Sequence, residues 1–256
     1  MQLYQAQIRK HMKKIHLIMP MGGKGSRFEK SGYNMPKPLI PLFDKPFFYW
    51  AVESINKYVE LEDIIFVVLQ EHIDNFEIDK EILKYYPKAI IQVIPEVLNG
   101  AVLTCLEGIK AVADDSPILF NDCDHMFLSK EFNNFCQLEM KAPIDGALLT
   151  FISDDPKYSF LELNEEQKVI RTVEKVAISN QAICGAYYFK NKDVFAEAVE
   201  KYLENCNYQE YFVSGVYNVM AENGKTIIKF ETDYHIPFGV PEEYEEAMQS
   251  DKFKEM

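Results

Sequence analysis

The chain has 256 residues, of which 48% are hydrophobic and 26% charged, and its formal net charge at pH 7 is −13. This is the composition of a globular protein with one substantial core. The negative charge argues against nucleic acid as a partner, because a phosphate backbone calls for a basic face. No apolar run approaches the roughly 18 residues that span a bilayer, so a membrane is not an expected partner either.

The cysteines and the N-terminal segment indicate where the protein works and where its domain begins. Five widely spaced cysteines include no CxxC pair and no cysteine-histidine spacing typical of a metal site. Free thiols of this kind are typical of a reducing compartment, so we expect a cytoplasmic protein. A polar segment without signal character precedes a second methionine, Met12. We predict that residues 1–11 form a disordered extension and that residues 12–256 form a single domain.

The first part of the chain alternates short apolar runs with amphipathic stretches. Predicted strands cover residues 15–20, 63–70, 89–95, 117–122 and 145–152, and predicted helices cover 45–59, 80–86 and 100–113. Most of the strands are β-branched and lack strict alternation, which is typical of strands buried on both faces of a parallel sheet. This order predicts an α/β fold with a doubly wound, mostly parallel sheet and helices on both faces.

The pattern becomes richer in strands after residue 152. Residues 159–175 predict a hairpin around the polar turn "NEEQ". The elements predicted after it are a strand at 183–190, helices at 192–205 and 209–224, a strand at 225–232 and a last helix from Pro241. We expect residues 153–190 to form a small β-rich elaboration packed against the sheet. The apolar residues of the last two helices fit either a homodimer surface or the core.

A glycine-rich loop, "MGGKGSRF" at residues 21–28, follows the first predicted strand directly. Glycines let backbone N–H groups approach an anion, and this end of the strand is the usual binding crevice of an α/β sheet. Lys24, Arg27 and Lys37 add positive charge suited to a triphosphate. Prolines on both sides hold Lys37 on a stiff extended segment. The spacing matches neither GxxxxGKS/T nor GxGxxG, and the alternative is a mobile turn with solvated cations.

Several motifs occur together in a recognisable order. "GGKGSRF", a short gap and "PKPLIPLFDKPFFYWAVESI" resemble the signature of the sugar-1-phosphate nucleotidylyltransferase family. "YSFLELNEEQKVIRTVEK", "SNQAICGAYYF" and "FGVPEEY" resemble later segments of the same family. The resemblance covers nearly the whole chain after Met12. It implies a Rossmann-like fold and a Mg²⁺-dependent reaction in which an acceptor phosphate attacks the α-phosphorus of a nucleoside triphosphate and releases pyrophosphate.

The resemblance also implies roles for residues around the nucleotide. Arg27 would neutralise the β- and γ-phosphates, and Lys37 would reach the α-phosphate during transfer. Loop residues expected to contact the nucleotide are Met21, Gly22, Gly23, Lys24, Gly25 and Ser26. Gly100 and Ala101 would allow close backbone approach to the base, with Gln70 and Glu96 as polar side chains nearby.

Two aspartates follow the strand predicted at 117–122, in the segment "LFNDCDHMF". Carboxylate oxygens suit Mg²⁺, which takes one or two protein ligands and fills its other positions with phosphate and water. By the family pattern Asp124 is the expected metal ligand and Asp122 the second choice, and His125 is a neighbour because Mg²⁺ prefers oxygen. The alternative is a solvated acidic turn or a helix cap. Pro237 occupies the position of a further metal aspartate in many relatives, and Asp233 is the nearest substitute.

The acceptor side departs from the family pattern. By resemblance Lys175 would grip the acceptor phosphate, with Glu174 and Tyr158 beside it, although the first two could instead form an exposed ion pair. Ser159 and Val176 replace the usual glycine and proline. An ordinary hexose 1-phosphate is therefore not implied. Overall similarity favours the cytidylyltransferases of capsular polysaccharide biosynthesis, with CTP as donor and phosphoglutamine as acceptor.

Two other functions fit the same residues. One is a nucleotidylyltransferase acting on glucose 1-phosphate or a phosphorylated alditol. The other is a non-catalytic regulatory subunit that keeps the fold and binds nucleotide. A regulatory chain would be expected to lack the loop arginine, the lysine between prolines or the aspartate at the strand end, and all three are present as Arg27, Lys37 and Asp124.

Overall fold

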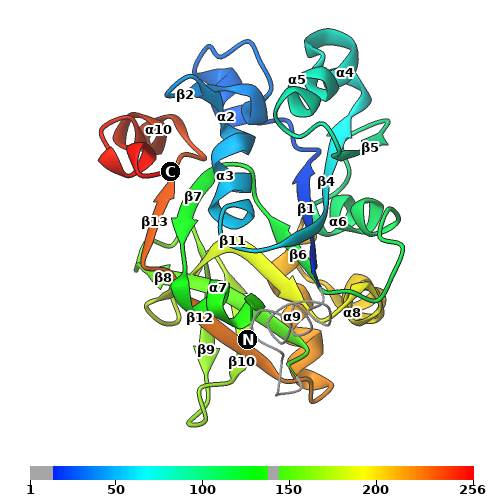
Figure 1. The fold of residues 1–256 in the computed structure, drawn as a ribbon. Coiled ribbons are helices and arrows are strands. Elements are labelled where there is room, and N and C mark those ends of the chain that lie inside the picture. The colour runs from blue at the N-terminus through cyan, green and yellow to red at the C-terminus, as the bar shows by residue number, and fades with distance from the viewer. Residues whose placement is uncertain (1–13, 138–143) are drawn as a thin grey trace, which may run out of the picture.

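The structure, a computed structural model, describes residues 14–137 and 144–256. The predicted extension at residues 1–11 lies outside these described residues, and the single domain from residue 12 onward stays a prediction. A nine-stranded sheet forms the centre of the described chain (Figure 1). Among the described helices, none is both long enough and apolar enough to cross a bilayer.

Four strands form the parallel part of the sheet. Their order is β6 (Ile118–Asn121), β1 (Ile15–Met21), β4 (Leu61–Leu69) and β5 (Ile90–Ile94). Ile18 of β1 is opposite Ile65 on one side and Phe120 on the other. The strands predicted at 15–20, 63–70, 89–95 and 117–122 are confirmed within two residues at each end. Their carboxyl ends lie at one edge of the sheet, where the glycine loop begins.

The remaining strands extend the sheet beyond β6. β11 (Gln181–Phe189) pairs antiparallel with β6, β8 (Gly146–Ile152) pairs antiparallel with β11, and β12 (Ile227–Glu231) runs parallel to β8. The fold class is therefore confirmed as α/β with a parallel centre and a mixed outer part.

The predicted hairpin consists of β9 (Ser159–Leu163) and β10 (Val169–Glu174). The sequence predicted that this hairpin packs against the sheet. In the structure it does not cover a face of the sheet. Ala182 of β11 pairs with Phe160 of β9, so the hairpin continues the sheet itself. Thr172 of β10 donates a hydrogen bond to the backbone oxygen of Ser214, which ties the hairpin to a helix.

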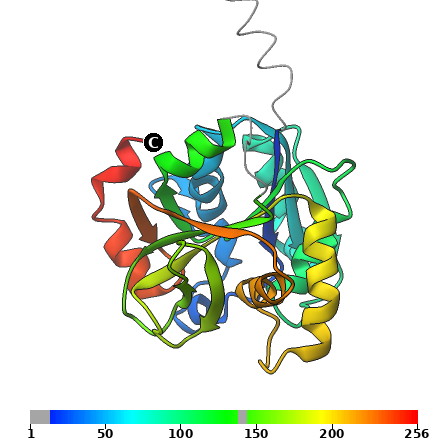
Figure 2. The same ribbon diagram turned by 90° about the horizontal axis from the view of Figure 1, so that it is seen from below.

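Helices cover both faces of the sheet, as predicted. α6 (Ala101–Ile109), α8 (Lys192–Asn205) and α9 (Val213–Glu222) bury apolar residues with Ile18 and Phe120 on one face. α3 (Phe47–Asn56), α5 (Ile78–Tyr85) and α7 (Lys130–Gln137) pack with Leu17 and Met19 on the other face. Figure 2 shows α8 in yellow and α9 in orange, away from α3 and α7. Since α9 buries its apolar residues in the core, its composition needs no homodimer surface, and a homodimer stays a prediction.

Sequence patterns missed several short elements. These are α2 (Ser26–Lys30), a 3-10 turn (Lys37–Leu39), β2 (Pro41–Leu42), β3 (Lys45–Pro46), α4 (Gln70–Phe76), β7 (His125–Leu128), β13 (Tyr234–Pro237) and a last 3-10 turn (Asp251–Lys254). β7 and β13 pair antiparallel, with Pro237 opposite His125. This pairing brings the segment before α10 (Pro241–Ala247) to the strand end that carries the two aspartates.

Candidate active site

The glycine loop lies against the segment that carries Lys37. Gly25 precedes α2 with a φ of 62°, and a Cβ atom there would come within 2.9 Å of the Lys37 Cβ. A left-handed φ and so close an approach both favour glycine. A Cβ on Gly23 would meet nothing within 4 Å, so the backbone there is open to a ligand. The loop thus presents bare backbone next to a lysine, as the sequence predicts.

Lys37 points at the aspartates. Its Nζ lies 2.6 Å from Oδ2 of Asp124, and Pro36 and Pro38 hold the backbone on either side. Burial by itself lowers the pKa of Lys37, but Asp124 raises it above its ordinary value. Lys37 is therefore a permanent cation, and it faces the group that the sequence predicts as metal ligand.

Two glycines hold the aspartates in place. The Asp122 N–H donates to the oxygen of Gly185 at 2.9 Å. A Cβ on Gly185, whose φ is +91°, would come within 2.6 Å of Asp122 Oδ2. A Cβ on Gly239 would come within 2.5 Å of Asp124 Oδ2. Backbone from β11 and from the segment before α10 therefore closes around both carboxylates.

Gly185→Ala is expected to destabilise the protein by about 3 kcal/mol and to lower activity, because the methyl group meets the Asp122 carboxylate and φ is left-handed. Gly224→Ala is the matched control. Its φ is also positive, at +72°, but a Cβ there meets nothing within 4 Å. Gly224→Ala should lower the free energy of unfolding by only about 1 kcal/mol and leave activity unchanged. Urea unfolding of both variants measures the difference, and equal losses would contradict the role of Gly185.

The two aspartates have opposite shifts in pKa. Burial, with the charge of Asp124, raises the pKa of Asp122 to about 7. Burial also tends to raise the pKa of Asp124, but Lys37 outweighs it and holds that pKa below its ordinary value. The site therefore crowds two carboxylates that one lysine only partly neutralises.

This crowding predicts that Asp122→Asn stabilises the metal-free protein. Between about pH 4 and pH 7 the folded chain holds a proton on Asp122 that the unfolded chain has lost, so this group's contribution to stability falls as pH rises through that window. The variant should gain up to about 4 kcal/mol in unfolding free energy near pH 8 and lose that gain toward pH 4. Urea titrations in EDTA at several pH values test this. A gain that does not change with pH would contradict it.

The carboxylates also fit a magnesium ion. Mg²⁺ takes one or two carboxylates and fills its other positions with phosphate oxygens and water. No cluster of three or more histidine, cysteine or acidic side chains that could hold a metal occurs within residues 14–137 and 144–256. Asp122 and Asp124, which line both cavities of this site, are the oxygen ligands that it would offer to a metal shared with phosphates.

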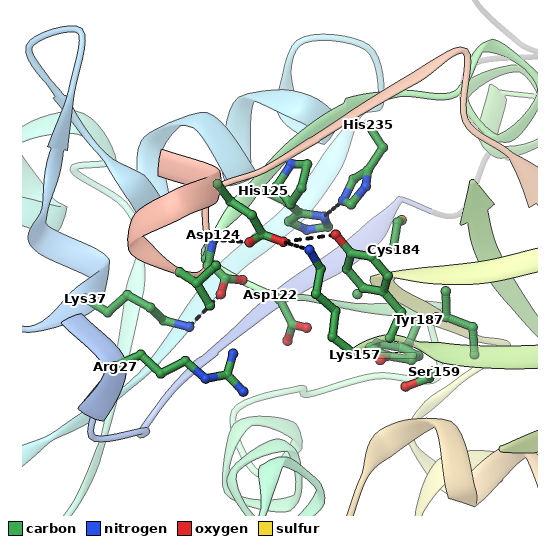
Figure 3. A pocket seen from close by; sticks show the side chains of 17 residues that line it. Arg27, Lys37, Asp122, Asp124, His125, Lys157, Ser159, Cys184, Tyr187 and His235 are labelled. Atoms are coloured by element: carbon green, nitrogen blue, oxygen red, sulfur yellow. Dashed lines mark hydrogen bonds and ion pairs between the residues drawn. The ribbon is translucent and has the colours of Figure 1, made fainter. Parts of the chain in front are cut away.

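A cavity of about 230 Å³ lies over this pair (Figure 3). Arg27 and Lys37 line it from the glycine loop side, and Lys157 and Tyr158 line it from the segment between β8 and β9. A smaller cavity of about 180 Å³ adjoins it and is lined by Met21, Gly23, Gly25, Lys37, Asp122 and Asp124, among others. The predicted loop, lysine and aspartates therefore come together around connected cavities.

Two neutral histidines lie beside Asp124. Asn121 Nδ2 donates to the Ala51 oxygen at 3.0 Å, so its Oδ1 accepts from His125 Nε2, also at 3.0 Å. His125 Nδ1 then accepts from His235 Nε2 at 3.2 Å. Burial lowers the pKa of His125 to about 4 and the pKa of His235 well below its ordinary value. The histidines add no positive charge to the cavity at neutral pH.

Asp233 lies outside this site, so its predicted role as a metal ligand is wrong. Its carboxylate accepts from the backbone N of Lys130 at 2.8 Å and lies 3.3 Å from Lys130 Nζ. β13 pairs Pro237 with His125, so Asp233 is four positions, roughly 13 Å, further along the strand. The Asp233 carboxylate caps the start of α7. A helix cap was the alternative role considered for Asp122 and Asp124, and the structure shows it at Asp233.

The residues predicted around the base are only partly placed near the loop. Gln70 donates to Asp74 at 2.8 Å within α4, and Glu96 is exposed. A Cβ on Gly100 would come within 2.4 Å of the Tyr211 backbone, so this packing alone requires glycine there, and its approach to the base stays a prediction. Ala101 begins α6. A cavity of about 490 Å³ does lie at the carboxyl ends of β4 and β5, lined by Leu69, His72 and Val97 and by Lys24 of the loop.

The predicted acceptor residues separate into two groups. Tyr158 lines the main cavity, but Lys175 is exposed, with its Nζ 5.2 Å from the centre of the Phe212 ring. Glu174 is buried and accepts hydrogen bonds from Ser159 Oγ at 2.5 Å and from Ser214. Tyr158 but not Lys175 therefore lies in the wall of the cavity, and the grip of Lys175 on the acceptor phosphate stays a prediction. The burial of Glu174 contradicts the alternative of an exposed ion pair between Glu174 and Lys175.

Sequence reasoning missed two charged residues of the cavity, Lys157 and Glu243. Lys157 directly precedes Tyr158, and Glu243 is in the "PEE" start of α10. The only signal for Lys157 was its place next to a residue already assigned to the acceptor side. Glu243 reaches the cavity through the pairing of β7 with β13, which the sequence did not predict.

Comparison with known proteins identifies the family. A model described as nucleotidyl transferase matches residues 16–252, so the chain belongs to the nucleotidyl transferase family. The chain is 27% identical over 231 residues to the D-glycero-alpha-D-manno-heptose 1-phosphate guanylyltransferase of Campylobacter jejuni, a match that covers 89% of this chain and 96% of that protein. It is 28% identical over 107 residues to human D-ribitol-5-phosphate cytidylyltransferase, covering 41% of this chain and 22% of that protein.

Solved structures share the fold. The nucleoside-diphosphate-sugar pyrophosphorylase of Vibrio cholerae superposes with a TM-score of 0.78 at 23% identity, covering 91% of this chain and 100% of that one. The inositol-1-phosphate CTP transferase of T. maritima has a TM-score of 0.74 at 14% identity, covering 93% and 95%. These likenesses confirm the predicted Rossmann-like fold, and the family match confirms the predicted reaction class, nucleotidyl transfer.

Proposed function

We propose that this nucleotidyltransferase transfers CMP from CTP to a small phosphorylated acceptor, in the presence of Mg²⁺, and releases pyrophosphate. One observation supports this most directly. Arg27, Lys37 and the pair Asp122 and Asp124 all face the cavities at the carboxyl end of the parallel strands. Cations and carboxylates around one space suit a reaction between two phosphate groups.

The chemistry follows from where these charges lie. An oxygen of the acceptor phosphate bonds to the α-phosphorus, the bond from the α-phosphorus to the bridging oxygen breaks, and pyrophosphate leaves with that electron pair. The open backbone at Gly23 and the guanidinium of Arg27 would hold the β- and γ-phosphates. Lys37 would follow the α-phosphate as its charge shifts. Asp124 and Asp122 would hold Mg²⁺, which supplies charge neutralisation to the phosphates when bound.

The donor base is proposed from similarity. The human relative is named a cytidylyltransferase and the T. maritima structure a CTP transferase, while the C. jejuni relative is named a guanylyltransferase. The cavity at the ends of β4 and β5 has room for a base beside the loop. CTP remains the proposed donor, and GTP is the first alternative to test.

The acceptor is proposed to be phosphoglutamine, as in capsule modification. The wall around Tyr158 supports an acceptor other than a hexose. Ser159 and Ser214 both donate to Oε1 of Glu174, so a sugar hydroxyl would compete with two serines for that oxygen. The same wall carries the ammonium of Lys157, which suits an acceptor with several anionic groups, such as a phosphorylated amino acid. A sugar 1-phosphate is the second candidate, because the C. jejuni relative is named for one.

Pyrophosphate release tests the function. The protein with Mg²⁺ would be given each of the four common nucleoside triphosphates, paired with phosphoglutamine, glucose 1-phosphate, a heptose 1-phosphate or a phosphorylated alditol. Release with CTP and phosphoglutamine alone is the expected result. Release with a sugar phosphate alone would overturn the acceptor, and release with GTP alone would overturn the donor. Tight nucleotide binding without any release would favour a regulatory subunit.

A further inference from the structure

Lys157 is the cation on the acceptor side of the main cavity. Among the described residues that line this cavity, the permanent cations are Arg27, Lys37 and Lys157. Arg27 and Lys37 come from the glycine loop and the segment after it. Lys157 approaches from the opposite side, in the segment between β8 and β9 (Figure 3). Lys157 is therefore the lysine that an anion entering from the acceptor side meets.

A carboxylate that is itself well satisfied holds Lys157 in position. Lys157 Nζ lies 3.0 Å from Glu243 Oε1 and 3.1 Å from Asp155 Oδ2. Glu243 also accepts from the Tyr158 hydroxyl at 2.9 Å and from the Gly239 N–H at 3.0 Å. The Glu243 side chain is only 11% exposed, whereas that of Lys157 is 44% exposed.

This arrangement lets Lys157 change partners at low cost. If Lys157 turns toward an anionic ligand, Glu243 keeps two hydrogen bonds and is not left as an unpaired buried charge. Asp155, with 46% of its side chain exposed, can be solvated by water. Partly exposed ion pairs of this kind contribute little net stability, so a phosphate can replace the carboxylates as the partner of Lys157.

Lys175 is absent from the residues that line the cavity. It follows β10 with a φ of 55°, its side chain is exposed, and its ammonium group lies over the Phe212 ring. The backbone N–H of Lys175 donates to the oxygen of Tyr158 at 3.0 Å, so the backbone segments that carry Lys157 and Lys175 lie side by side. The side chains nevertheless diverge, and that of Lys157 is the one that lines the cavity.

We propose that Lys157, positioned by Glu243, binds the phosphate of the acceptor, the role that family resemblance assigns to Lys175. This inference rests on the proposed function because it requires that the acceptor carry a phosphate. It does not depend on which phosphorylated acceptor is used. Lys157 touches the substrate in this proposal. Glu243 acts through Lys157 and is a positioning residue.

Steady-state kinetics of matched variants test the proposal. Lys157→Met should raise the KM for the acceptor or lower its kcat/KM by about 10²-fold, with the KM for the nucleotide changed less than about threefold. Lys157→Arg should recover part of the loss, and Lys175→Met should stay within about threefold of wild type. Glu243→Gln should raise the acceptor KM without changing the nucleotide KM. A larger loss in Lys175→Met than in Lys157→Met, or an equal rise in both KM values, would overturn the proposal.

Binding of inorganic phosphate separates this proposal from the proposed function. If none of the acceptors supports pyrophosphate release by the wild-type protein, the proposed function fails before any variant is compared. Calorimetric titration with inorganic phosphate, of protein saturated with a CTP analogue that has a methylene α,β-bridge, still tests Lys157. About tenfold weaker binding to Lys157→Met than to Lys175→Met is expected. Equal binding to both variants would overturn the assignment.

Discussion

Asp124→Asn is expected to lower Mg²⁺-dependent turnover by about 10³-fold or more while the protein remains folded. The asparagine keeps the shape that the Gly239 backbone requires but loses the charge that faces Lys37 and is proposed to bind Mg²⁺. Asp122 remains nearby to offset the charge of Lys37, so the melting temperature should change by only a few degrees. Turnover across a range of Mg²⁺ concentrations, with circular dichroism of the same preparation, measures both effects.

Asp233→Asn is the matched control for this variant. Both aspartates border the pairing of β7 with β13, but Asp233 caps α7 and pairs with Lys130 rather than facing the cavity. The substitution should cost less than about 1 kcal/mol of stability, because asparagine Oδ1 can still accept from the Lys130 N–H, and turnover should stay within about twofold of wild type. If Asp233→Asn abolished turnover and Asp124→Asn did not, the assignment of the metal ligand would be reversed.

The different fates of these two aspartates show what the sequence could predict. Asp124 lies three residues after the end of the buried parallel strand β6, so its place at the carboxyl edge depends only on local order along the chain. The position of Asp233 depends on the register of β13 against β7, strands more than a hundred residues apart in sequence. Such pairing is set by tertiary packing and leaves no periodic signal in a four-residue strand.

The acceptor side was less predictable for a similar reason. A lysine in the polar run "DDPKYS" looks like any solvated lysine. Its direction is set by Glu243, which reaches it from α10. Gly100 shows the converse problem. A glycine with positive φ signals close approach of something, but the sequence does not distinguish a ligand from the Tyr211 backbone that occupies the space here.

The ion pair between Lys37 and Asp124 bears on how the site changes during turnover. Lys37 Nζ lies 2.6 Å from the oxygen that is proposed to bind Mg²⁺. A lysine ammonium and a magnesium ion compete for the same carboxylate charge, so binding of the metal requires Lys37 to give up part of this contact. The lysine would then be free to follow the α-phosphate toward the adjoining loop cavity, which Lys37 also lines.

Lys37→Met should therefore separate catalysis from metal binding. Turnover should fall by about 10²-fold to 10³-fold, because a positioned cation is lost from the transition state. Affinity for Mg²⁺ should rise rather than fall, because Asp122 and Asp124 lose their competing partner. Calorimetric titration with MgCl₂ and steady-state kinetics measure the two effects. Lys30→Met, which removes an exposed lysine of α2, is the control and should change neither. Weaker Mg²⁺ binding in Lys37→Met would show that the lysine organises the carboxylates instead of competing for them.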